Sequence, residues 1–354
     1  MNSMHDHRIV VDDQLPLIAD VLPGDAIIRV DASNITNDVL RACNATALLI
    51  RSTTRVTYDL LIGTRISFVG SATAGLDHIE QDLLQDRNIR VVGAPGCNAN
   101  AVAEYVVIWL SELNIPAAST VGIIGFGNVG QHLARYAVAR GHDVLVSDPP
   151  LADLRYQFPS LVRHVSLDEL LRRSDVISVH TPYTTSGSHA THNLINAERM
   201  QLIRSGALVI NTARGSVIDE PSLCSRVNNG DLTSVLDVFA NEPTPNLETV
   251  TTVHHCTPHI AGYSESAKYQ GARMVLKALR AHIGADFAIP ELSELLRRRS
   301  TQREDQLLVL NHPFRDAYIT TPTSQTFEMC RRLTPLRTEH TQPPTWEKLH
   351  GHRA

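Results

Sequence analysis

The chain contains little cysteine, no excess of basic residues and no long apolar run. Its five cysteines are an odd number without paired or metal-ligand spacing, which predicts reduced thiols and no bound metal (Cys43, Cys97, Cys224, Cys256 and Cys330). The formal net charge of −5 offers no basic field for nucleic acid. No run approaches the ~18 apolar residues of a membrane span, and the first residues lack a signal-peptide pattern. We therefore expect a cytoplasmic protein that binds neither nucleic acid nor membranes.

The composition is that of a globular protein with a substantial core. Hydrophobic residues make up 43% of the chain and charged residues 19%. A length of 354 residues accommodates two domains. No internal repeat is visible.

Short runs rich in Val and Ile recur through the first hundred residues, separated by helix-length segments. The runs are Ile9–Val11, Ala26–Val30, Ala47–Ile50, Ile66–Val69 and Ile89–Val92. This alternation predicts a parallel sheet. Open α/β sheets bind ligands beyond the carboxyl ends of their strands, so the polar turns after Ile50 and Val69 are candidate ligand contacts. The alternative for each turn is a loop that merely connects.

The most informative stretch is Thr120 to Pro150. It predicts a strand, the glycine turn Gly125-Phe-Gly127-Asn-Val-Gly130, a helix, and a second strand that ends at Asp148. In a dinucleotide-binding unit the first glycine allows the tight turn and the second lets backbone amides approach a pyrophosphate. The third lets the helix pack close to the strand. The helix N-terminus then faces the diphosphate with its partial positive charge.

Asp148 indicates which dinucleotide binds. A carboxylate at the tip of the second strand accepts hydrogen bonds from the adenosine ribose hydroxyls and repels a 2′-phosphate. The stretch therefore predicts NAD rather than NADP. An ordinary turn between a strand and a helix is the alternative.

The alternation of strands and helices continues on both sides of this stretch. We expect helices at Asn98–Leu113, Leu167–Leu171, Val217–Asn229 and Ser264–Ile283, and strands at Val176–His180, Ala207–Ile210, Ser234–Leu236 and Thr251–His254. From residue 290 the chain contains Arg297-Arg298-Arg299, several prolines and one short apolar run, Leu307–Leu310. This end of the chain is either an interaction appendage or partly disordered.

We therefore predict an α/β protein with two doubly wound parallel-sheet domains, Rossmann-like or flavodoxin-like, and a cleft between them. Residues 1–98, completed by 259–289, form a substrate-binding domain, and residues 99–258 form an NAD-binding Rossmann domain. Residues 290–354 form a short, atypical C-terminal appendage, which is a candidate dimerisation remnant.

Three polar residues follow strands of the second domain: Arg214, Glu242 and His259. Each alone is equally compatible with a solvated loop residue. Together they match the needs of 2-hydroxy acid oxidation, which requires a base for the hydroxyl proton and a cation for the carboxylate. Imidazole has a pKa near working pH, guanidinium matches the two oxygens of a carboxylate, and a nearby carboxylate stabilises the charged imidazole.

The ordered motifs GFGNVG…SDPP, HTPYT, NTARGSVIDE, LDVFANEP and TPHIAGY resemble the D-isomer-specific 2-hydroxyacid dehydrogenase family over about residues 8 to 285. The resemblance implies that Arg214 binds the substrate carboxylate, that His259 is the general acid/base and that Glu242 pairs with it. It also implies that Asp237 approaches the nicotinamide side. The cofactor residues implied by the motifs are Gly125, Gly127, Asn128, Val129, Gly130, Asp148, Thr181, Thr212, Ala213, Arg214, Asp237 and Gly262.

Four further stretches resemble one subfamily, the erythronate-4-phosphate dehydrogenases: VDDQLP from Val11, RSTT from Arg51, SATAGLDH from Ser71 and APGCNA from Ala94. This resemblance implies oxidation of 4-phospho-D-erythronate to 2-oxo-3-hydroxy-4-phosphobutanoate in vitamin B6 biosynthesis, and a homodimer. It implies substrate contacts from Ser52, Thr73 and Tyr263. Arg51 and Arg55 are candidates for binding the 4-phosphate, because a phosphate dianion requires fixed cations.

Two other functions are compatible with these residues. One is another D-2-hydroxyacid dehydrogenase, acting on phosphoglycerate, glyoxylate or hydroxypyruvate, which shares Arg214, Glu242 and His259. The other is a non-catalytic, NAD-sensing binding protein on the same fold, because fold alone does not decide function. Turnover on a panel of substrates separates the three.

Overall fold

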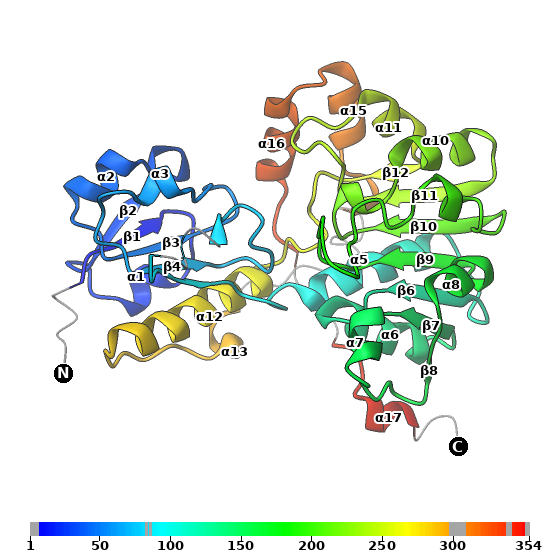
Figure 1. The fold of residues 1–354 in the computed structure, drawn as a ribbon, viewed down its shortest axis with the longest axis horizontal. Helices are drawn as coiled ribbons and strands as arrows, with labels where there is room; N and C mark the ends of the chain where they lie inside the picture. Colours follow the sequence, from blue (N-terminus) through cyan, green and yellow to red (C-terminus); the bar gives the residue numbers. More distant parts are fainter. Residues whose placement is uncertain (1–6, 82–83, 85–86, 297–308, 338–341, 351–354) are drawn as a thin grey trace. The chain divides into compact units, whose positions relative to one another are not determined.

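In a computed structural model of the chain, the described residues are 7–81, 84, 87–296, 309–337 and 342–350. They form two compact units (Figure 1). The first unit contains the described residues up to Asn98 together with residues 264–296. The second unit contains Ala99–Tyr263 and the described residues after 308. Residues 259–263, which we expected to complete the first unit, therefore belong to the second.

The first unit contains a five-stranded parallel sheet. Its strands are β1 (Ile9–Asp12), β2 (Ile27–Val30), β3 (Ala47–Ile50), β4 (Phe68–Ser71) and β5 (Arg90–Val92). Their order is β2-β1-β3-β4-β5, the flavodoxin-like arrangement of a doubly wound sheet. All four pairings are parallel, so the carboxyl ends of the strands share one edge.

Helices cover both faces of this sheet because successive strand residues point to opposite sides. Ile9 and Val11 pack in one buried cluster with α1 (Ile18–Val21) and α12 (Glu265–Ile283), whereas Val10 packs in the other with α2 (Asn37–Ala42) and α3 (Tyr58–Leu61). A Cβ on Gly70 would lie 2.4 Å from Val275 of α12, so glycine is required for this close packing. Two further short helices of this unit are η2 (Ala32–Asn34) and α13 (Leu292–Leu295).

The second unit contains a seven-stranded parallel sheet. Its strands are β6 (Thr120–Ile124), β7 (Asp143–Ser147), β8 (Val162–His164), β9 (Val176–Val179), β10 (Ala207–Asn211), β11 (Leu232–Leu236) and β12 (His255–Cys256). Their order is β12-β11-β10-β9-β6-β7-β8, so the winding reverses between β6 and β9. In open α/β sheets such a reversal is where ligands bind.

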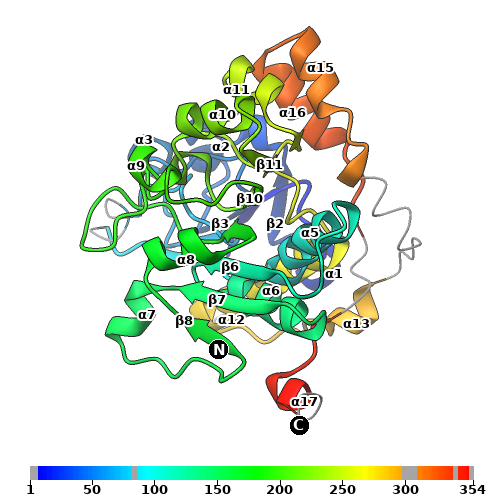
Figure 2. The same ribbon diagram turned by 90° about the vertical axis from the view of Figure 1, so that its right-hand side faces the viewer.

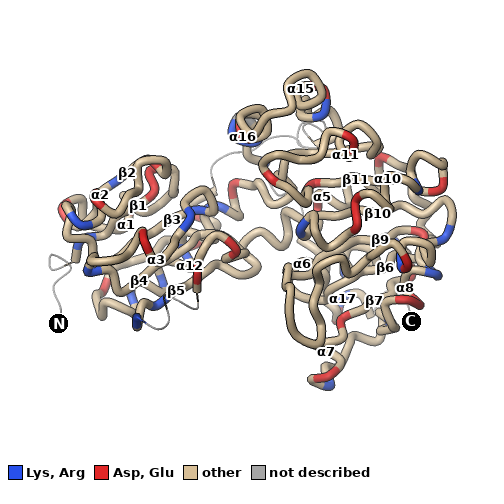
Figure 3. The backbone as a smooth tube through the Cα atoms, turned by 45° about the horizontal axis from the view of Figure 1, so that its top comes forward, with Lys and Arg blue, Asp and Glu red and all other residues tan. Residues whose placement is uncertain are grey.

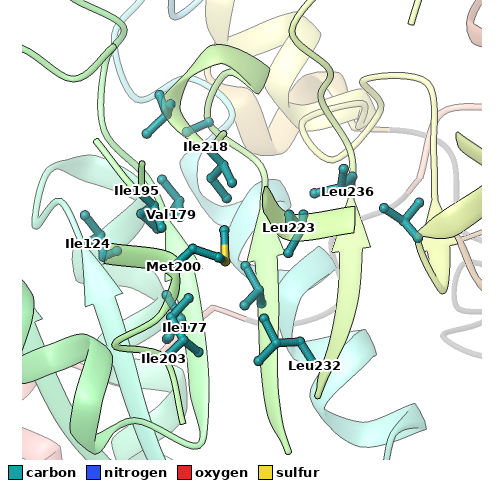
Figure 4. Close-up of a cluster of buried hydrophobic side chains, with 14 of the residues drawn as sticks. Ile124, Ile177, Val179, Ile195, Met200, Ile203, Ile218, Leu223, Leu232 and Leu236 are labelled. Atoms are coloured by element: carbon teal, nitrogen blue, oxygen red, sulfur yellow. The ribbon is translucent and has the colours of Figure 1, made fainter. Parts of the chain in front are cut away.

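One face of this sheet is covered by α5 (Ala99–Glu112) and α6 (Asn128–Ala139), which pack side by side (Figure 2). The other face packs against α8 (Leu167–Arg173), α9 (Ala197–Met200), α10 (Glu220–Asn228) and α11 (Leu247–Thr252). Figure 4 shows this second core, in which Met200 lies among side chains of the sheet such as Ile177. The two short helices η3 (Gly215–Val217) and α7 (Pro149–Asp153) each follow a strand end.

The described part of the C-terminal segment is folded onto the second unit. Helix α15 (Phe314–Thr320) packs on α11 and α16 (Ser324–Leu333) packs on α15, and α17 (Trp346–His350) contacts α6 (Figure 1). Phe314, Tyr318 and Phe327 are buried in the same core as the helices α8 to α11. Residues 309–337 are thus part of the second unit's core rather than an appendage; Arg297–Arg299 lie outside the described residues.

The structure corrects two of the predicted elements. The strand predicted at Thr251–His254 is wrong, because α11 continues to Thr252 and the strand is His255–Cys256. The helix predicted from Val217 begins at Glu220, since Asp219 is its N-cap and accepts a hydrogen bond from the Ser222 amide. The first error arises because Val and Thr, which favour strands, make up the last turn of α11. The second arises because the start of α10 is decided by one capping side chain, that of Asp219.

Charged residues of both signs are distributed over both units (Figure 3), in keeping with the net charge of −5. No helix among the described residues is both long enough and apolar enough to cross a membrane.

Candidate active site

The glycine turn between β6 and α6 is built as a dinucleotide-binding turn requires. Gly125 has a φ of +91°, and a Cβ there would lie 2.8 Å from the His180 carbonyl oxygen. A Cβ on Gly130 would lie 2.1 Å from the Gly125 carbonyl oxygen, so the helix packs directly on the turn. Around Gly127, by contrast, no described atom lies within 4 Å of a Cβ position. The middle glycine therefore faces open space, which is where a diphosphate approaches.

The N-terminus of α6 and Asp148 flank this open space. Gly127 is the N-cap of α6, and no described side chain caps the first amides of the helix, which include those of Asn128 and Val129. The Asp148 carboxylate accepts hydrogen bonds from the Phe126 amide at 2.7 Å and from the Leu151 amide at 3.0 Å. The carboxylate is therefore fixed beside the glycine turn and retains lone pairs for a ribose hydroxyl.

The ends of β9 and β10 place three further residues together. His180 contacts the hydroxyls of Ser178 at 2.8 Å and Thr212 at 3.2 Å, and burial lowers its pKa to about 3. The imidazole is therefore neutral and serves as a rigid link between the two strand ends. The buried hydroxyl oxygen of Thr181 has no hydrogen-bond partner among the described residues. An orphaned hydroxyl of this kind is suited to a ligand that supplies the partner.

Arg214 lies in a turn that its neighbours hold rigidly. The Asn211 side chain accepts a hydrogen bond from the Ala213 amide and donates one to the Arg214 carbonyl oxygen, both at 3.0 Å. The next residue, Gly215, would place a Cβ 1.8 Å from the Phe239 backbone. No other residue fits there without moving the backbone that leads to Glu242.

Glu242 and His259 form a close pair. His259 Nδ1 lies 2.7 Å from Glu242 Oε2, and Glu242 Oε1 accepts a hydrogen bond from the Phe239 amide at 2.9 Å. Burial alone would raise the pKa of Glu242, but the charge and hydrogen bond of His259 and the Phe239 amide outweigh it and lower the pKa. The carboxylate is thus ionised and fixes the orientation of the imidazole. Nε2 is the ring nitrogen that remains for chemistry.

Asp237 holds the turn that carries His259. Its carboxylate accepts hydrogen bonds from the Thr257 hydroxyl at 2.6 Å and from the amides of Ile260 and Ala261 at 2.7 and 2.9 Å. Its backbone oxygen accepts one from the His259 amide at 2.7 Å. His259 has a φ of +57°, which is uncommon for a residue with a side chain, so the turn depends on these bonds. Burial raises the pKa of Asp237 to about 6, with His259 and the three donors opposing the rise.

The second unit therefore brings together most of the residues that the sequence singled out. The glycine turn, Asp148, Thr181, Thr212, Ala213, Arg214, Asp237, Glu242, His259, Gly262 and Tyr263 all lie at the carboxyl ends of its strands or in the turns that follow them. The predicted substrate residues Ser52, Thr73, Arg51 and Arg55 belong to the first unit.

In the first unit, the structure gives Arg51 a partner that the sequence analysis did not foresee. Arg51 makes a bidentate ion pair with Asp12 at 2.9 and 3.0 Å, and Asp12 is fully buried. Arg55 is 78% exposed and only distantly paired with Glu80, at 3.9 Å. The guanidinium of Arg51 is thus largely occupied, and Arg55 is the more available cation.

The turns after β3 and β4 carry hydroxyls. Ser52 is exposed. Thr73 shares a hydrogen bond with Ser71 at 2.6 Å, and Ser71 also contacts His78 Nε2 at 2.9 Å. The β4 turn is therefore a small connected network rather than a plain loop.

The residues that hold the site residues in place were not predicted from the sequence. Asn211 holds the turn that carries Arg214, and His180 connects the ends of two strands. Thr257 connects Asp237 to the Tyr105 hydroxyl at 2.7 Å, and Arg337 donates to the turn after His259. A polar residue at the end of a buried apolar strand was a usable signal for Asn211. Nothing in the sequence relates Tyr105 or Arg337 to residues 152 or 76 positions away, because only the fold brings them together.

A doubly wound sheet with a glycine turn at its switch point, and a His–Glu pair at its carboxyl edge, defines a nucleotide-dependent dehydrogenase. The family model "D-isomer specific 2-hydroxyacid dehydrogenase, NAD binding domain" matches residues 111–261. The chain is 41% identical over 286 residues to an erythronate-4-phosphate dehydrogenase of Shewanella loihica, covering 78% of this chain and 74% of the relative. A Marinobacter nauticus enzyme of the same name is 41% identical over 285 residues, covering 78% of this chain and 73% of that relative.

Solved structures agree in fold. The D-lactate dehydrogenase of Aquifex aeolicus, complexed with NAD and lactic acid, aligns with a TM-score of 0.64 and 25% identity, covering 80% of this chain and 100% of that one. The chain therefore belongs to the D-isomer specific 2-hydroxyacid dehydrogenase family. It is an NAD-dependent dehydrogenase, and the predictions of family, of two parallel-sheet α/β domains and of NAD are confirmed.

Proposed function

We propose that this protein oxidises 4-phospho-D-erythronate to 2-oxo-3-hydroxy-4-phosphobutanoate with NAD, in the cytoplasm, as a step of vitamin B6 biosynthesis. The observation that carries the chemistry is the His259–Glu242 pair at 2.7 Å on a turn fixed by Asp237. The observation that favours this substrate is the identity of about 40% to erythronate-4-phosphate dehydrogenases over most of the chain.

In this proposal His259 is the base. Its Nδ1 is directed at Glu242, so Nε2 accepts the proton of the substrate C2 hydroxyl. NAD bound at this site would supply the hydride acceptor for C2, so that loss of the proton and of the hydride together oxidises the alcohol to the ketone. Glu242 stabilises the imidazolium that results, because an ionised carboxylate at 2.7 Å favours the charged ring. General-base catalysis of this kind typically contributes ~10²–10⁴-fold.

Arg214 binds the C1 carboxylate in this proposal. Its turn is held by Asn211 and by the close approach of Gly215 to Phe239, so the guanidinium starts from a rigid backbone. Such rigidity suits bidentate recognition, which requires the fork to meet both oxygens at once.

Tyr263, Ser52 and Thr73 are proposed as further substrate contacts, on the resemblance to the subfamily. For the 4-phosphate we propose Arg55 before Arg51. Arg51 already makes two hydrogen bonds to buried Asp12, whereas Arg55 is exposed and weakly paired.

The residues present fit NAD. The open space beside Gly127 and the uncapped first amides of α6 suit the diphosphate, and Asp148 suits the adenosine ribose. The orphaned hydroxyl of Thr181, with Thr212 and Ala213, suits the nicotinamide half. We further propose a homodimer, on the resemblance to the subfamily; light scattering of the purified protein tests it.

A substrate panel tests the function. Purified protein with NAD is assayed on 4-phosphoerythronate, 3-phosphoglycerate, glycerate and D-lactate, with a 2-oxo acid present to reoxidise tightly held NADH. His259→Asn is the control for contaminating activity and is expected to lose at least ~10²-fold in kcat. Turnover confined to 4-phosphoerythronate supports the proposal. Preference for another acid overturns the substrate, and NAD binding without any turnover overturns catalysis.

A further inference from the structure

Arg337, near the end of the described C-terminal segment, is a buried cation behind the turn that carries His259. The residue is 3% exposed. One guanidinium nitrogen donates hydrogen bonds to the carbonyl oxygens of Ala261 and, at 3.1 Å, Ala101. Its backbone amide donates to the Tyr263 carbonyl oxygen at 3.2 Å. One residue therefore binds the chain immediately after His259 at two points.

These contacts extend a network that includes Asp237. The Ala261 carbonyl accepts from Arg337, while the Ala261 amide donates to Asp237 at 2.9 Å. Asp237 accepts from Thr257, which contacts the Tyr105 hydroxyl at 2.7 Å. The Arg337 guanidinium lies 6.0 Å from the centre of the Tyr105 ring. The turn is thus held on one side by Asp237 and on the other by Arg337.

The helices that precede Arg337 fix it to the rest of the unit. The Tyr318 hydroxyl of α15 donates to the Pro245 carbonyl oxygen at 2.9 Å, three residues after Glu242. Arg315 donates to the carbonyl oxygens of His254 at 2.9 Å and Thr251 at 2.6 Å. The Phe314 ring packs 5.9 Å from that of Phe239, whose amide binds Glu242. Helix α15 therefore anchors the chain just before Glu242 and the segment between Glu242 and His259.

Helix α16 adds charge at the same place. The positive charge of Arg331 contributes, with His259, to the lowered pKa of Glu242. It therefore favours the ionised carboxylate that the pair with His259 requires.

We propose that residues 309–337 act as a brace, that is, a segment that holds the turn at residues 257–263 in place. Arg337 is its positioning residue and keeps His259 and Tyr263 in the positions that the substrate requires. The inference rests on the proposed roles of His259 and Tyr263. The physical reason is that His259 has an uncommon backbone conformation, which persists only where surrounding bonds over-determine it. Because displacement of a reacting group by ~1 Å costs up to ~10²-fold in rate, a remote residue that fixes the turn affects turnover.

The test uses the full-length protein with NAD bound and three variants. Arg337→Met removes the guanidinium donors but keeps an apolar side chain of similar length. Arg337→Lys keeps the charge and one donor group but loses the planar fork. Arg332→Met is the matched control, because Arg332 is an exposed arginine on α16. Hydrogen exchange followed by mass spectrometry is measured on the peptide 257–263 and on peptides from β10 and β11, and kcat and KM are measured on 4-phosphoerythronate.

The expected result for Arg337→Met is local. Exchange in 257–263 rises at least ~10-fold while β10 and β11 are unchanged, and kcat falls ~10–100-fold. Arg337→Lys recovers part of both losses, and Arg332→Met matches the wild type.

Unchanged exchange in 257–263 overturns the proposal, as does faster exchange over the whole unit, which indicates general destabilisation instead. If Arg337→Met does not fold, Arg337→Lys carries the same comparison. Because the exchange measurement needs no substrate, it decides the brace even if the wild type does not oxidise 4-phosphoerythronate; that outcome refutes the proposed substrate alone.

Discussion

Replacing Glu242 with glutamine tests the centre of the proposed mechanism with a change of very few atoms. The two carboxylate oxygens each accept one hydrogen bond, from the Phe239 amide at 2.9 Å and from His259 Nδ1 at 2.7 Å. Glutamine offers one oxygen and one NH₂ group, so it cannot accept both. If the glutamine oxygen faces His259, its NH₂ group faces the Phe239 amide N–H. Neither donor then has an acceptor, which costs about 1–3 kcal/mol.

The favoured arrangement is therefore the reverse, with the amide oxygen at Phe239 and the NH₂ group at His259. Nδ1 must then be the acceptor, so the proton moves to Nε2 and the ring no longer serves as a base. The reactive tautomer is then reached only through the disfavoured arrangement, which costs about 1–3 kcal/mol. The variant also loses a charge-assisted hydrogen bond to the imidazolium, which is worth about 1.5–3 kcal/mol. The sum of these two free energies is about 2.5–6 kcal/mol. At 1.36 kcal/mol per tenfold, this predicts a fall in kcat of about 10²–10⁴-fold.

The assay is steady-state NADH formation for the wild type, Glu242→Gln and the control Glu248→Gln, whose side chain is exposed. NAD affinity, measured by NADH fluorescence or calorimetry, is expected to stay within ~2-fold in both variants, because the glycine turn is untouched. A Glu242→Gln enzyme that retains kcat within ~5-fold refutes the reasoning, since neither the tautomer nor the charge then matters.

Three further predictions concern the cofactor and pH. Gly127→Ala is expected to keep the fold, since no described atom lies within 4 Å of the new Cβ, but to weaken NAD binding at least ~10-fold, measured by calorimetry. Gly130→Ala is expected to lower the melting temperature instead, because its Cβ would lie 2.1 Å from a backbone oxygen. Asp148→Ala is expected to narrow the preference for NAD over NADP by at least ~10-fold in kcat/KM, and an unchanged ratio rules out its role at the ribose. Because the folded-state pKa of Glu242 is lowered, its ionised carboxylate stabilises the protein fully above its ordinary pKa of 4.5 and loses this contribution as pH falls through the lowered value. Urea unfolding should therefore show a wild-type advantage over Glu242→Gln at about pH 5 that shrinks as the pH falls below 4.5.

Local patterns in the sequence were sufficient for the architecture. Val- and Ile-rich runs spaced by helix-length segments are typical of buried parallel strands, and the structure has parallel strands where nearly all of these runs occur. The glycine turn was equally predictable, because each glycine meets a local requirement. Gly125 has a positive φ, Gly130 lets the helix pack close to the turn, and Gly127 leaves open space where a ligand can approach the backbone. Element ends were less predictable, since a single capping side chain such as Asp219 decides them.

The sequence by itself thus determined the family, the parallel sheets, the cofactor and a short set of polar residues at strand ends. Only the tertiary structure decided which of those residues touch and what holds them. Glu242 and His259 meet because two strand ends lie at one sheet edge, and Arg51 pairs with Asp12 because β3 lies beside β1. The contacts of residues 309–337 were the least predictable. Arg337 reaches Ala261 through packing of α15 and α16 on the core, and hydrophobic packing is non-directional, so the local sequence does not specify which distant segment it covers.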